Sequence, residues 1–253
     1  MKKNSMTDTQ LPNDLQKAAL RGEPSYVWRA GQERRLAMIR QYGADSVREK
    51  LLVNGCGMGE YLARLTDEAQ LAVGLDIELH RLLEAKKKNE HLVCAAGEHL
   101  PFRSGQFTAV LSNEVIEHVE DERMAIEEIT RSLKEGGLMI LFCPNRGYPF
   151  ETHGVYWRGK YHFGNKLFVN YLPRSLRNRL APHVRVYTRG DLEKLFHGLP
   201  FEVESKMTIF GAYDNIIKKQ PLLGKMLRAV IHFLEKTPIN RLGLSHFWVV
   251  RKQ

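Results

Sequence analysis

Short apolar runs alternate with amphipathic stretches along most of the chain. Five runs have the length and composition of buried strands, and segments with helical periodicity follow most of them. These runs are residues 51–53, 71–75, 91–95, 109–111 and 138–143. Strands that alternate with helices at this spacing predict a doubly wound, Rossmann-like α/β fold, with a mostly parallel sheet and helices on both faces. One helix, predicted over 121–134, is expected to end at Gly136-Gly137, where a left-handed cap favours glycine.

The alternation stops after the fifth apolar run. It resumes with a predicted helix over 189–196, strand over 201–205, helix over 222–234 and strand over 245–251, which brings the sheet to seven strands. We therefore divide the chain into four parts, with a lid inserted after strand 5. They are an N-terminal arm (1–28), a core (29–145), a basic aromatic lid (146–188) and a C-terminal part that completes the sheet and carries an amphipathic helix (189–253).

The net charge of +9 is unevenly distributed over the 253 residues. Residues 146–253 hold 19 Lys and Arg against 7 Asp and Glu, whereas residues 1–145 hold 19 against 22. The second half therefore predicts either an anionic partner or a solvated basic face. No run reaches the roughly 18 apolar residues of a membrane span, and no secretory signal is expected. Three scattered cysteines exclude a disulfide scaffold and a zinc finger and favour the cytoplasm.

A glycine-rich turn follows the first strand. It reads Gly55-Cys56-Gly57-Met58-Gly59, and glycines at that place let a ligand approach the backbone and the amides of the next helix. Asp76 stands at the end of the second strand, where an acid can accept hydrogen bonds from both hydroxyls of a ribose. The combination predicts a nucleoside-cofactor site at the open edge of the sheet.

These residues resemble class I S-adenosylmethionine-dependent methyltransferases. Residues 51–59 resemble the first motif of that family, and four further segments agree in order and spacing: 73–77, 97–102, 106–119 and 133–138. The resemblance implies the seven-stranded fold of the family and S-adenosylmethionine as the cofactor. It also implies the cofactor-binding residues, which are Asn54, Gly55, Cys56, Gly57, Gly59, Asp76, Ile77, Gly97, Glu98, Ser112 and Asn113.

The chain departs from the family at two positions. Val53 and Ala96 stand where the family usually has acids. Each loss removes about one charge-assisted hydrogen bond, worth roughly 1.5–3 kcal/mol. Besides an active methyltransferase, the sequence therefore leaves open a non-catalytic, methyltransferase-like partner protein.

The segment after the fourth strand bears on the methyl acceptor. It reads Ser-Asn-Glu-Val over 112–115 and lacks the Asn/Asp-Pro-Pro-Tyr/Phe signature of N-methylation, which favours O-methylation. Glu114, Glu117 and His118 are spaced to share one helical face, and a similar run occurs in ubiquinone-biosynthesis O-methyltransferases. They would either hold a divalent ion or form a helix start beside the cofactor, and we assign no metal.

The predicted catalytic residues lie in the lid. His153 is the candidate general base because the imidazole pKa ordinarily lies near neutrality, and Glu151 would orient it or bind the acceptor. Alternatively, both residues brace the lid. A set of aromatic residues either walls an acceptor pocket or forms a small core of the lid: Tyr156, Trp157, Tyr161, His162 and Phe163.

The basic half also bears on partners and location. A basic amphipathic helix within 218–236 either lies on an anionic membrane or packs on the core. We expect a small-molecule acceptor that is phosphorylated or lipid-linked, and a cytoplasmic protein with peripheral contact at the inner membrane surface. An RNA methyltransferase is the alternative, and it is less favoured because no RNA-binding module is appended.

Overall fold

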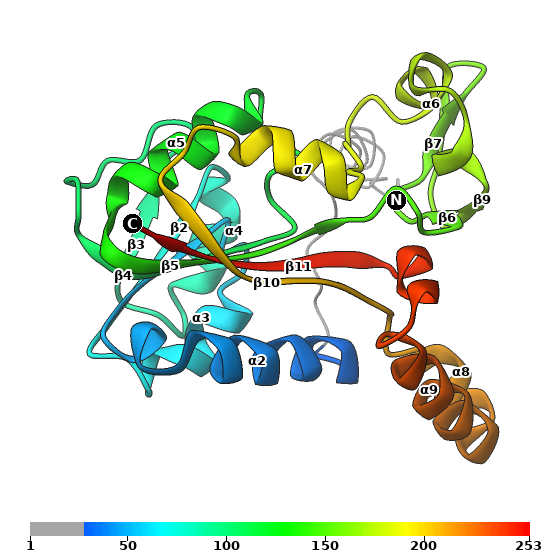
Figure 1. The fold of residues 1–253 in the computed structure, drawn as a ribbon, viewed down its shortest axis with the longest axis horizontal. Helices are drawn as coiled ribbons and strands as arrows, with labels where there is room; N and C mark the ends of the chain where they lie inside the picture. The colour runs from blue at the N-terminus through cyan, green and yellow to red at the C-terminus, as the bar shows by residue number, and fades with distance from the viewer. Residues whose placement is uncertain (1–27) are drawn as a thin grey trace, which may run out of the picture.

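The computed structural model describes residues 28–253, so the predicted N-terminal arm lies almost entirely outside the described residues. A seven-stranded sheet with the order β10-β11-β5-β4-β1-β2-β3 forms the centre of the molecule (Figure 1). All strands run parallel except β11, which is antiparallel to both β5 and β10. The predicted doubly wound sheet is thereby confirmed. Its strands are β1 (Lys50–Asn54), β2 (Leu71–Asp76), β3 (Leu92–Cys94), β4 (Phe107–Asn113), β5 (Leu133–Pro144), β10 (Phe201–Ile209) and β11 (Ser245–Lys252).

Helices cover both faces of the sheet (Figure 1). Helices α2 (Ala30–Gly43) and α3 (Glu60–Thr66) pack on one face, and α5 (Glu122–Ser132) and α7 (Arg189–Phe196) pack on the other. Alternation along β1 divides its side chains between the two layers: Leu51 and Val53 join the first, and Leu52 joins the second. Each such buried aliphatic side chain contributes about 1.5–3 kcal/mol of transfer free energy.

The order of the strands reverses at β1, which lies between β2 and β4. In doubly wound sheets a crevice opens at such a point, outside the carboxyl ends of the strands. Three polar residues end the strands there: Asn54 on β1, Asp76 on β2 and Asn113 on β4. Helix α4 (Leu79–Ala85) follows β2 beside this edge.

The predicted end of the helix over 121–134 is wrong. Helix α5 begins after Asp121, whose side chain accepts hydrogen bonds from the amides of Arg123 and Met124, and it ends at Ser132, before an extended Leu133. The chain enters β5 at once, and the pairing of β5 with β4 shifts register between residues 133 and 138. The left-handed Gly136 (φ 72°) lies in this irregularity, so the glycine serves a bulge and not a helix cap.

The segment after β5 is an excursion whose two ends meet. The amide of Tyr187 donates to the carbonyl of Pro144 at 3.0 Å, and that of Arg146 donates to Tyr187 at 2.9 Å. We refer to residues 146–188 as the lid. The lid contains two small two-stranded sheets and two short helical segments: β6 (Phe150–Glu151), β7 (Val155–Trp157), β8 (Lys160–His162), β9 (Lys166–Leu167), η2 (Val169–Tyr171) and α6 (Arg174–Leu180).

The connection from β10 to β11 forms a helical hairpin. It contains α8 (Asp214–Lys219), α9 (Pro221–Leu234) and η3 (Pro238–Leu242), at the same end of the molecule as the lid (Figure 1). Within residues 28–253, none of the helices has the length and apolar character that crossing a membrane requires.

Candidate active site

The loop after β1 depends on glycine for its conformation. Gly55, Gly57 and Gly59 have φ values of 70°, 54° and 76°. A Cβ on Gly55 would lie 2.3 Å from Cγ2 of Val115, whereas one on Gly57 would meet nothing within 4 Å. The loop therefore packs tightly at Gly55 and presents bare main chain at Gly57.

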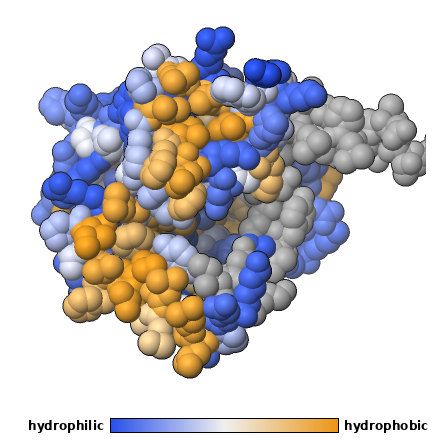
Figure 2. All heavy atoms as spheres, turned by 90° about the vertical axis from the view of Figure 1, so that its right-hand side faces the viewer, coloured by the Kyte–Doolittle hydropathy of each residue, from blue (hydrophilic) through white to orange (hydrophobic). Residues whose placement is uncertain are grey.

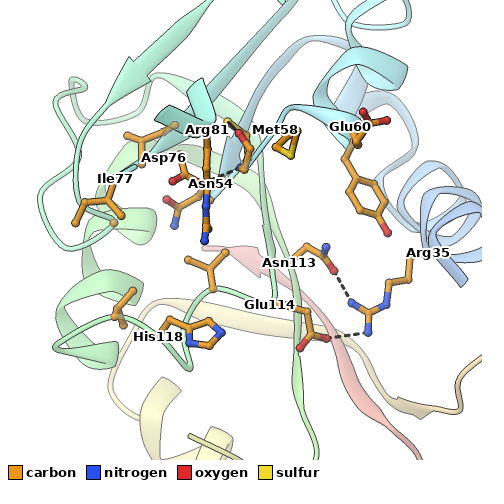
Figure 3. A pocket seen from close by; sticks show the side chains of 18 of the residues that line it. Arg35, Asn54, Met58, Glu60, Asp76, Ile77, Arg81, Asn113, Glu114 and His118 are labelled. Carbon is orange, nitrogen blue, oxygen red and sulfur yellow. Dashed lines mark hydrogen bonds and ion pairs between the residues drawn. The ribbon is translucent and has the colours of Figure 1, made fainter. Parts of the chain in front are cut away.

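A cavity of about 830 Å³ lies at this edge of the sheet (Figure 3). Gly59 and Ser112 do not line it: Gly59 faces Asn89 of the segment after α4, and Ser112 is fully buried in β4. The other residues expected to bind the cofactor do line it, namely Asn54, Gly55, Cys56, Gly57, Asp76, Ile77, Gly97, Glu98 and Asn113.

Asp76 holds the glycine-rich loop in place. Its Oδ2 accepts a hydrogen bond from the amide of Gly57 at 2.8 Å, and its Oδ1 accepts one from the amide of Glu78 at 2.9 Å. A carboxylate has about four acceptor positions, so two remain for ligand hydroxyls. The sequence indicated the ligand role but not this bracing role, since nothing in it shows that the loop folds back onto Asp76.

Asn54 has a buried amide group that is not satisfied. Its side chain is 1% exposed, and neither Oδ1 nor Nδ2 has a hydrogen-bond partner among residues 28–253. Both atoms lie 3.4 Å from the position that a Cβ on Gly97 would occupy. Such a group ordinarily costs about 1–3 kcal/mol, so an unpaired one that lines a cavity indicates a place for a ligand.

Glu98, which lines the same cavity, accepts a hydrogen bond from the backbone amide of Glu120 at 2.6 Å.

Sequence reasoning missed Arg35, which reaches the same cavity from α2. Its guanidinium donates to Oδ1 of Asn113 at 2.7 Å and forms an ion pair with Glu114 at 2.8 Å (Figure 3). Ser245 on β11 donates to the same carboxylate at 2.5 Å. Burial alone would raise the pKa of Glu114, but Arg35 and Ser245 outweigh it and lower that pKa to about 2. Only the fold brings α2 and β11 to this point.

The prediction that Glu114, Glu117 and His118 share a helical face is wrong. Glu114 has a left-handed backbone (φ 56°), and residues 116–118 form a turn. The Glu114 side chain pairs with Arg35, and it also lies beside the carboxyl group of Glu117. Burial and the neighbouring Glu114 carboxylate raise the pKa of Glu117 well above its usual range. Burial, followed by the charge of His153, lowers the pKa of His118 to about 4.

The two predicted catalytic residues form a pair in the lid. Nδ1 of His153 lies 3.1 Å from Oε1 of Glu151, and the backbone amide of His153 donates to the same oxygen at 2.9 Å. The other carboxylate oxygen is paired with the buried guanidinium of Arg177. Burial would raise the pKa of Glu151, but the bonds from His153 and Arg177 outweigh it and lower that pKa to about 2. The hydroxyl of Tyr161 and Nε2 of His183 approach the His153 carbonyl and fix the position of this segment.

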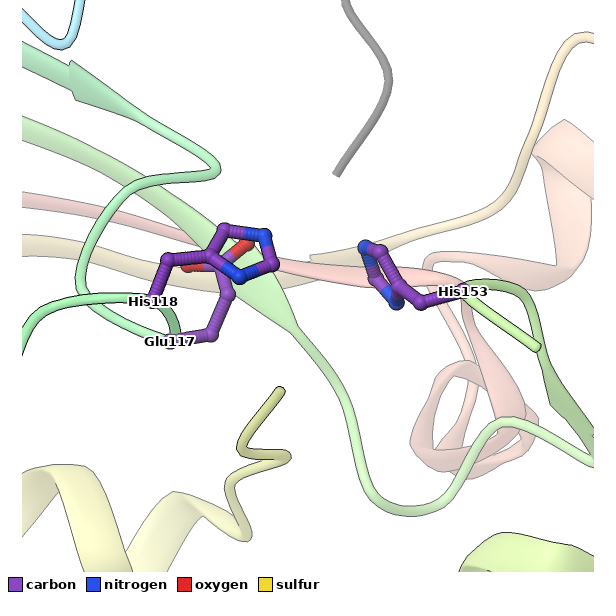
Figure 4. Close-up of side chains that lie close together, drawn as sticks. All are labelled: Glu117, His118 and His153. Carbon is purple, nitrogen blue, oxygen red and sulfur yellow. The ribbon is translucent and has the colours of Figure 1, made fainter. Parts of the chain in front are cut away.

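His153 also lies beside the turn that follows β4. Glu117, His118 and His153 each offer one ligand atom, and these atoms lie within 4.8 Å of one another (Figure 4). The rings of His118 and His153 meet edge to face at 5.5 Å. One carboxylate and two imidazoles at this spacing could hold a divalent ion.

The aromatic residues of the lid do not line the cavity. Tyr156 and Tyr161 pack on each other and on His183, at centroid distances of 5.2–5.8 Å. Trp157, His162 and Phe163 are exposed. A second cavity of about 230 Å³ adjoins the first, because Arg35, Glu114 and His153 line both. Tyr148 and Phe150, which precede the predicted set, supply its aromatic wall.

Comparisons with known proteins agree with this geometry. Residues 52–141 match the family described as "Methyltransferase domain". A "Probable S-adenosylmethionine-dependent methyltransferase" of Mycolicibacterium smegmatis is 26% identical over 63% of this chain and 54% of its own length. A crystal structure of an S-adenosylmethionine-dependent methyltransferase from Mesorhizobium loti is 17% identical, with a TM-score of 0.61 over 88% of this chain and 98% of that chain. Residues 52–141 are thus similar to a methyltransferase domain, and the fold around them is that of solved S-adenosylmethionine-dependent methyltransferases.

One relative covers more of the sequence without adding a function. "Uncharacterized protein MJ1252" of Methanocaldococcus jannaschii is 29% identical over 66% of this chain and 58% of its own length. The chain thus spans a little over half the length of these two curated relatives.

The Mycolicibacterium smegmatis and Mesorhizobium loti proteins are named for S-adenosylmethionine, and the residues that line the large cavity fit that molecule. The bare main chain of Gly57 suits close approach by the cofactor, and Asp76 keeps acceptor positions for ribose hydroxyls. The unpaired amide of Asn54, together with the backbone at Gly97, offers a donor and an acceptor to a planar base. Val53 packs in the α2–α3 layer. The polar side chain at the end of β1 is therefore Asn54, the next residue, which lies on the opposite face of the sheet.

Proposed function

We propose that the chain transfers the methyl group of S-adenosylmethionine to an oxygen of a small acceptor that is anionic or lipid-linked, with His153 as general base. The observation that carries the proposal is the Glu151–His153 pair at the boundary of the two cavities. The larger cavity holds the cofactor residues, and the smaller one is the candidate acceptor site.

The pair suits removal of a proton from a hydroxyl. Because Nδ1 of His153 donates to Glu151, Nε2 is the nitrogen that accepts the acceptor's proton. Glu151 stays ionised, since its pKa is about 2, and it stabilises the imidazolium that forms. His118 stays neutral beside it, so no like charge opposes this proton transfer. Bound S-adenosylmethionine supplies the methyl group, and the remaining work of the chain is to position the two reactants.

The charge of the second half supports an anionic acceptor. Residues 146–190 hold nine Lys and Arg against the single acid Glu151, and arginine suits phosphate and carboxylate recognition. A "Malonyl-[acyl-carrier protein] O-methyltransferase" of Enterobacter lignolyticus is 30% identical over 36% of this chain. The name of that relative gives O-methylation of an acyl-carrier-bound acid as its reaction, which is compatible with the acceptor class proposed here.

The test is an acceptor screen with the purified protein. Phosphorylated, carboxylated and lipid-linked hydroxyl compounds, and RNA, are each incubated with S-adenosylmethionine, and release of S-adenosylhomocysteine is measured. For an accepted substrate, His153→Gln is expected to lower turnover by ~100-fold or more while cofactor affinity stays within about twofold. His162→Gln, an exposed histidine of the same lid, is the matched control.

Four outcomes would refute the proposal. Full activity of His153→Gln would show that His153 is not the general base. Methyl transfer to RNA and to no small molecule would contradict the proposed acceptor class. Absence of cofactor binding would favour the non-catalytic alternative. A base mechanism also predicts that activity survives EDTA. Loss in EDTA with recovery on adding a divalent ion would assign Glu117, His118 and His153 to a metal site instead.

A further inference from the structure

Helix α9 turns its apolar side away from the protein. Six large side chains on it are exposed, by 37–76%, at spacings typical of one helix face. They are Leu222, Leu223, Met226, Leu227, Val230 and Phe233. An amphipathic helix of a globular domain normally buries this face, so the orientation of α9 is reversed.

The packing of α9 explains this orientation. Gly224 is the buried residue of the helix, and a Cβ there would lie 2.6 Å from Cα of Ile217. The side of α9 that carries a glycine is thus pressed against α8, and the side that carries the large apolar residues faces outward. The hairpin is anchored to α2 by Arg34, which pairs with Glu235 at 2.9 Å.

The hairpin that carries the apolar face is positively charged. Residues 214–242 contain six Lys and Arg against two acids, Asp214 and Glu235, and Arg34 pairs with Glu235. The exposed bases include Lys219, Lys225, Lys236 and Arg241. Apolar side chains flanked by lysine and arginine match the interface of an anionic bilayer, where the chains enter the headgroup region and the bases meet lipid phosphates.

The lid adds a second apolar area at the same end of the molecule. Trp157, Phe163, Leu167 and Phe168 are 53–62% exposed there. Figure 2 looks onto this end and shows hydrophobic surface at the height of the lid and, below it, at the height of α8 and α9. Exposed patches of this kind mark interaction sites on soluble proteins.

We propose that α9 and the exposed apolar residues of the lid dock on an anionic phospholipid bilayer. His153 of the lid lines both cavities, and Ala212 of the β10–α8 connection lines the larger one, so docking brings the lipid surface to the end of the molecule where the two cavities meet. The proposal goes beyond the proposed function because the membrane contact needs neither the cofactor nor an acceptor.

The test is co-sedimentation of the full chain with vesicles, without S-adenosylmethionine. We expect binding to vesicles of phosphatidylcholine and phosphatidylglycerol, weaker binding as salt rises, and little binding to phosphatidylcholine alone. The triple variant Leu222→Gln, Met226→Gln, Phe233→Gln is expected to lower the partition coefficient by ~100-fold. These side chains are exposed, so the fold is retained, as circular dichroism will show. Leu79→Gln with Leu83→Gln, two equally exposed leucines on α4, is the matched control.

Fluorescence gives a second readout for the lid. Of the three tryptophans, Trp248 is buried, Trp28 is half-buried and Trp157 is exposed. Brominated lipids are therefore expected to quench the fluorescence of the wild type more than that of Trp157→Phe.

Equal vesicle binding by wild type and triple variant would overturn the proposal, and so would no binding to anionic vesicles at low salt. If the wild type does not bind vesicles but forms a dimer, and the triple variant is a monomer, the apolar face is instead occupied by a second copy of the chain. Quenching that is the same in Trp157→Phe would remove the lid from the contact.

Discussion

Replacing Asp76 by alanine tests the two roles that the structure gives this residue. The carboxylate accepts hydrogen bonds from the amides of Gly57 and Glu78, and it keeps acceptor positions for the cofactor. The variant should therefore be less stable without any ligand, and it should also bind S-adenosylmethionine more weakly.

The magnitudes follow from the two contacts. A hydrogen bond to a charged group contributes about 1.5–3 kcal/mol, so losing both costs at least ~3 kcal/mol in the ligand-free protein. For a domain of this size that corresponds to a fall in Tm of roughly 6–12 °C. Loss of the ribose contacts should weaken cofactor binding by a further ~10–100-fold.

The assay is calorimetry in two forms. Scanning calorimetry of the ligand-free protein gives Tm, and titration with S-adenosylmethionine and S-adenosylhomocysteine gives the Kd. Asp67→Ala, an exposed acid at the end of α3, is the control. An unchanged Tm would refute the bracing role of Asp76, and an unchanged Kd would remove it from the cofactor site.

Two further predictions concern buried polar groups. Asn54→Ala should raise Tm of the ligand-free protein by a few degrees, because it deletes a buried unpaired amide. The same variant should weaken cofactor binding by ~10-fold. A fall in Tm together with an unchanged Kd would contradict this reasoning. His118 should make the fold acid-sensitive in EDTA: its pKa is about 4 when folded and near 6.5 when unfolded, so the unfolded state binds the proton more readily. Its stabilisation, about 3 kcal/mol, is complete above pH 6.5 and is lost as pH falls toward 4. Urea titrations across this range should show a shallower pH dependence for His118→Gln, and parallel curves would exclude the effect.

The sheet could be predicted because its strands carry their signal locally. Buried parallel strands read as short apolar runs, and the turn after β1 needs glycine whatever surrounds it. The Gly136 error arose where two local explanations compete, since a left-handed glycine serves a helix cap and a strand bulge equally well. The pairing of β5 with β4 decides between them, and sequence spacing does not contain it.

The candidate site was harder to predict because it depends on distant contacts. Asp76 and His153 were predicted from their position beside strand ends, and both line the large cavity. Arg35 carries no local mark, and its role appears only when α2 is laid against Glu114. The turn at Glu114 was missed because a left-handed glutamate is uncommon, so helical spacing was the better inference from sequence. Helix α9 was recognised as amphipathic, but the side that it buries depends on Gly224 and its packing against α8.

The antiparallel strand β11 has a consequence for the segment that matches the methyltransferase family. That segment, residues 52–141, begins inside β1 and stops inside β5. In the whole chain β5 pairs with β11 from Leu138 to Pro144, so an excised segment would present a hydrophobic open edge, which invites aggregation. It would also lack Arg35 and His153. The stretch by which the family is recognised is therefore not a portable unit, because on its own it exposes an edge of the sheet and lacks two residues that line the cavity.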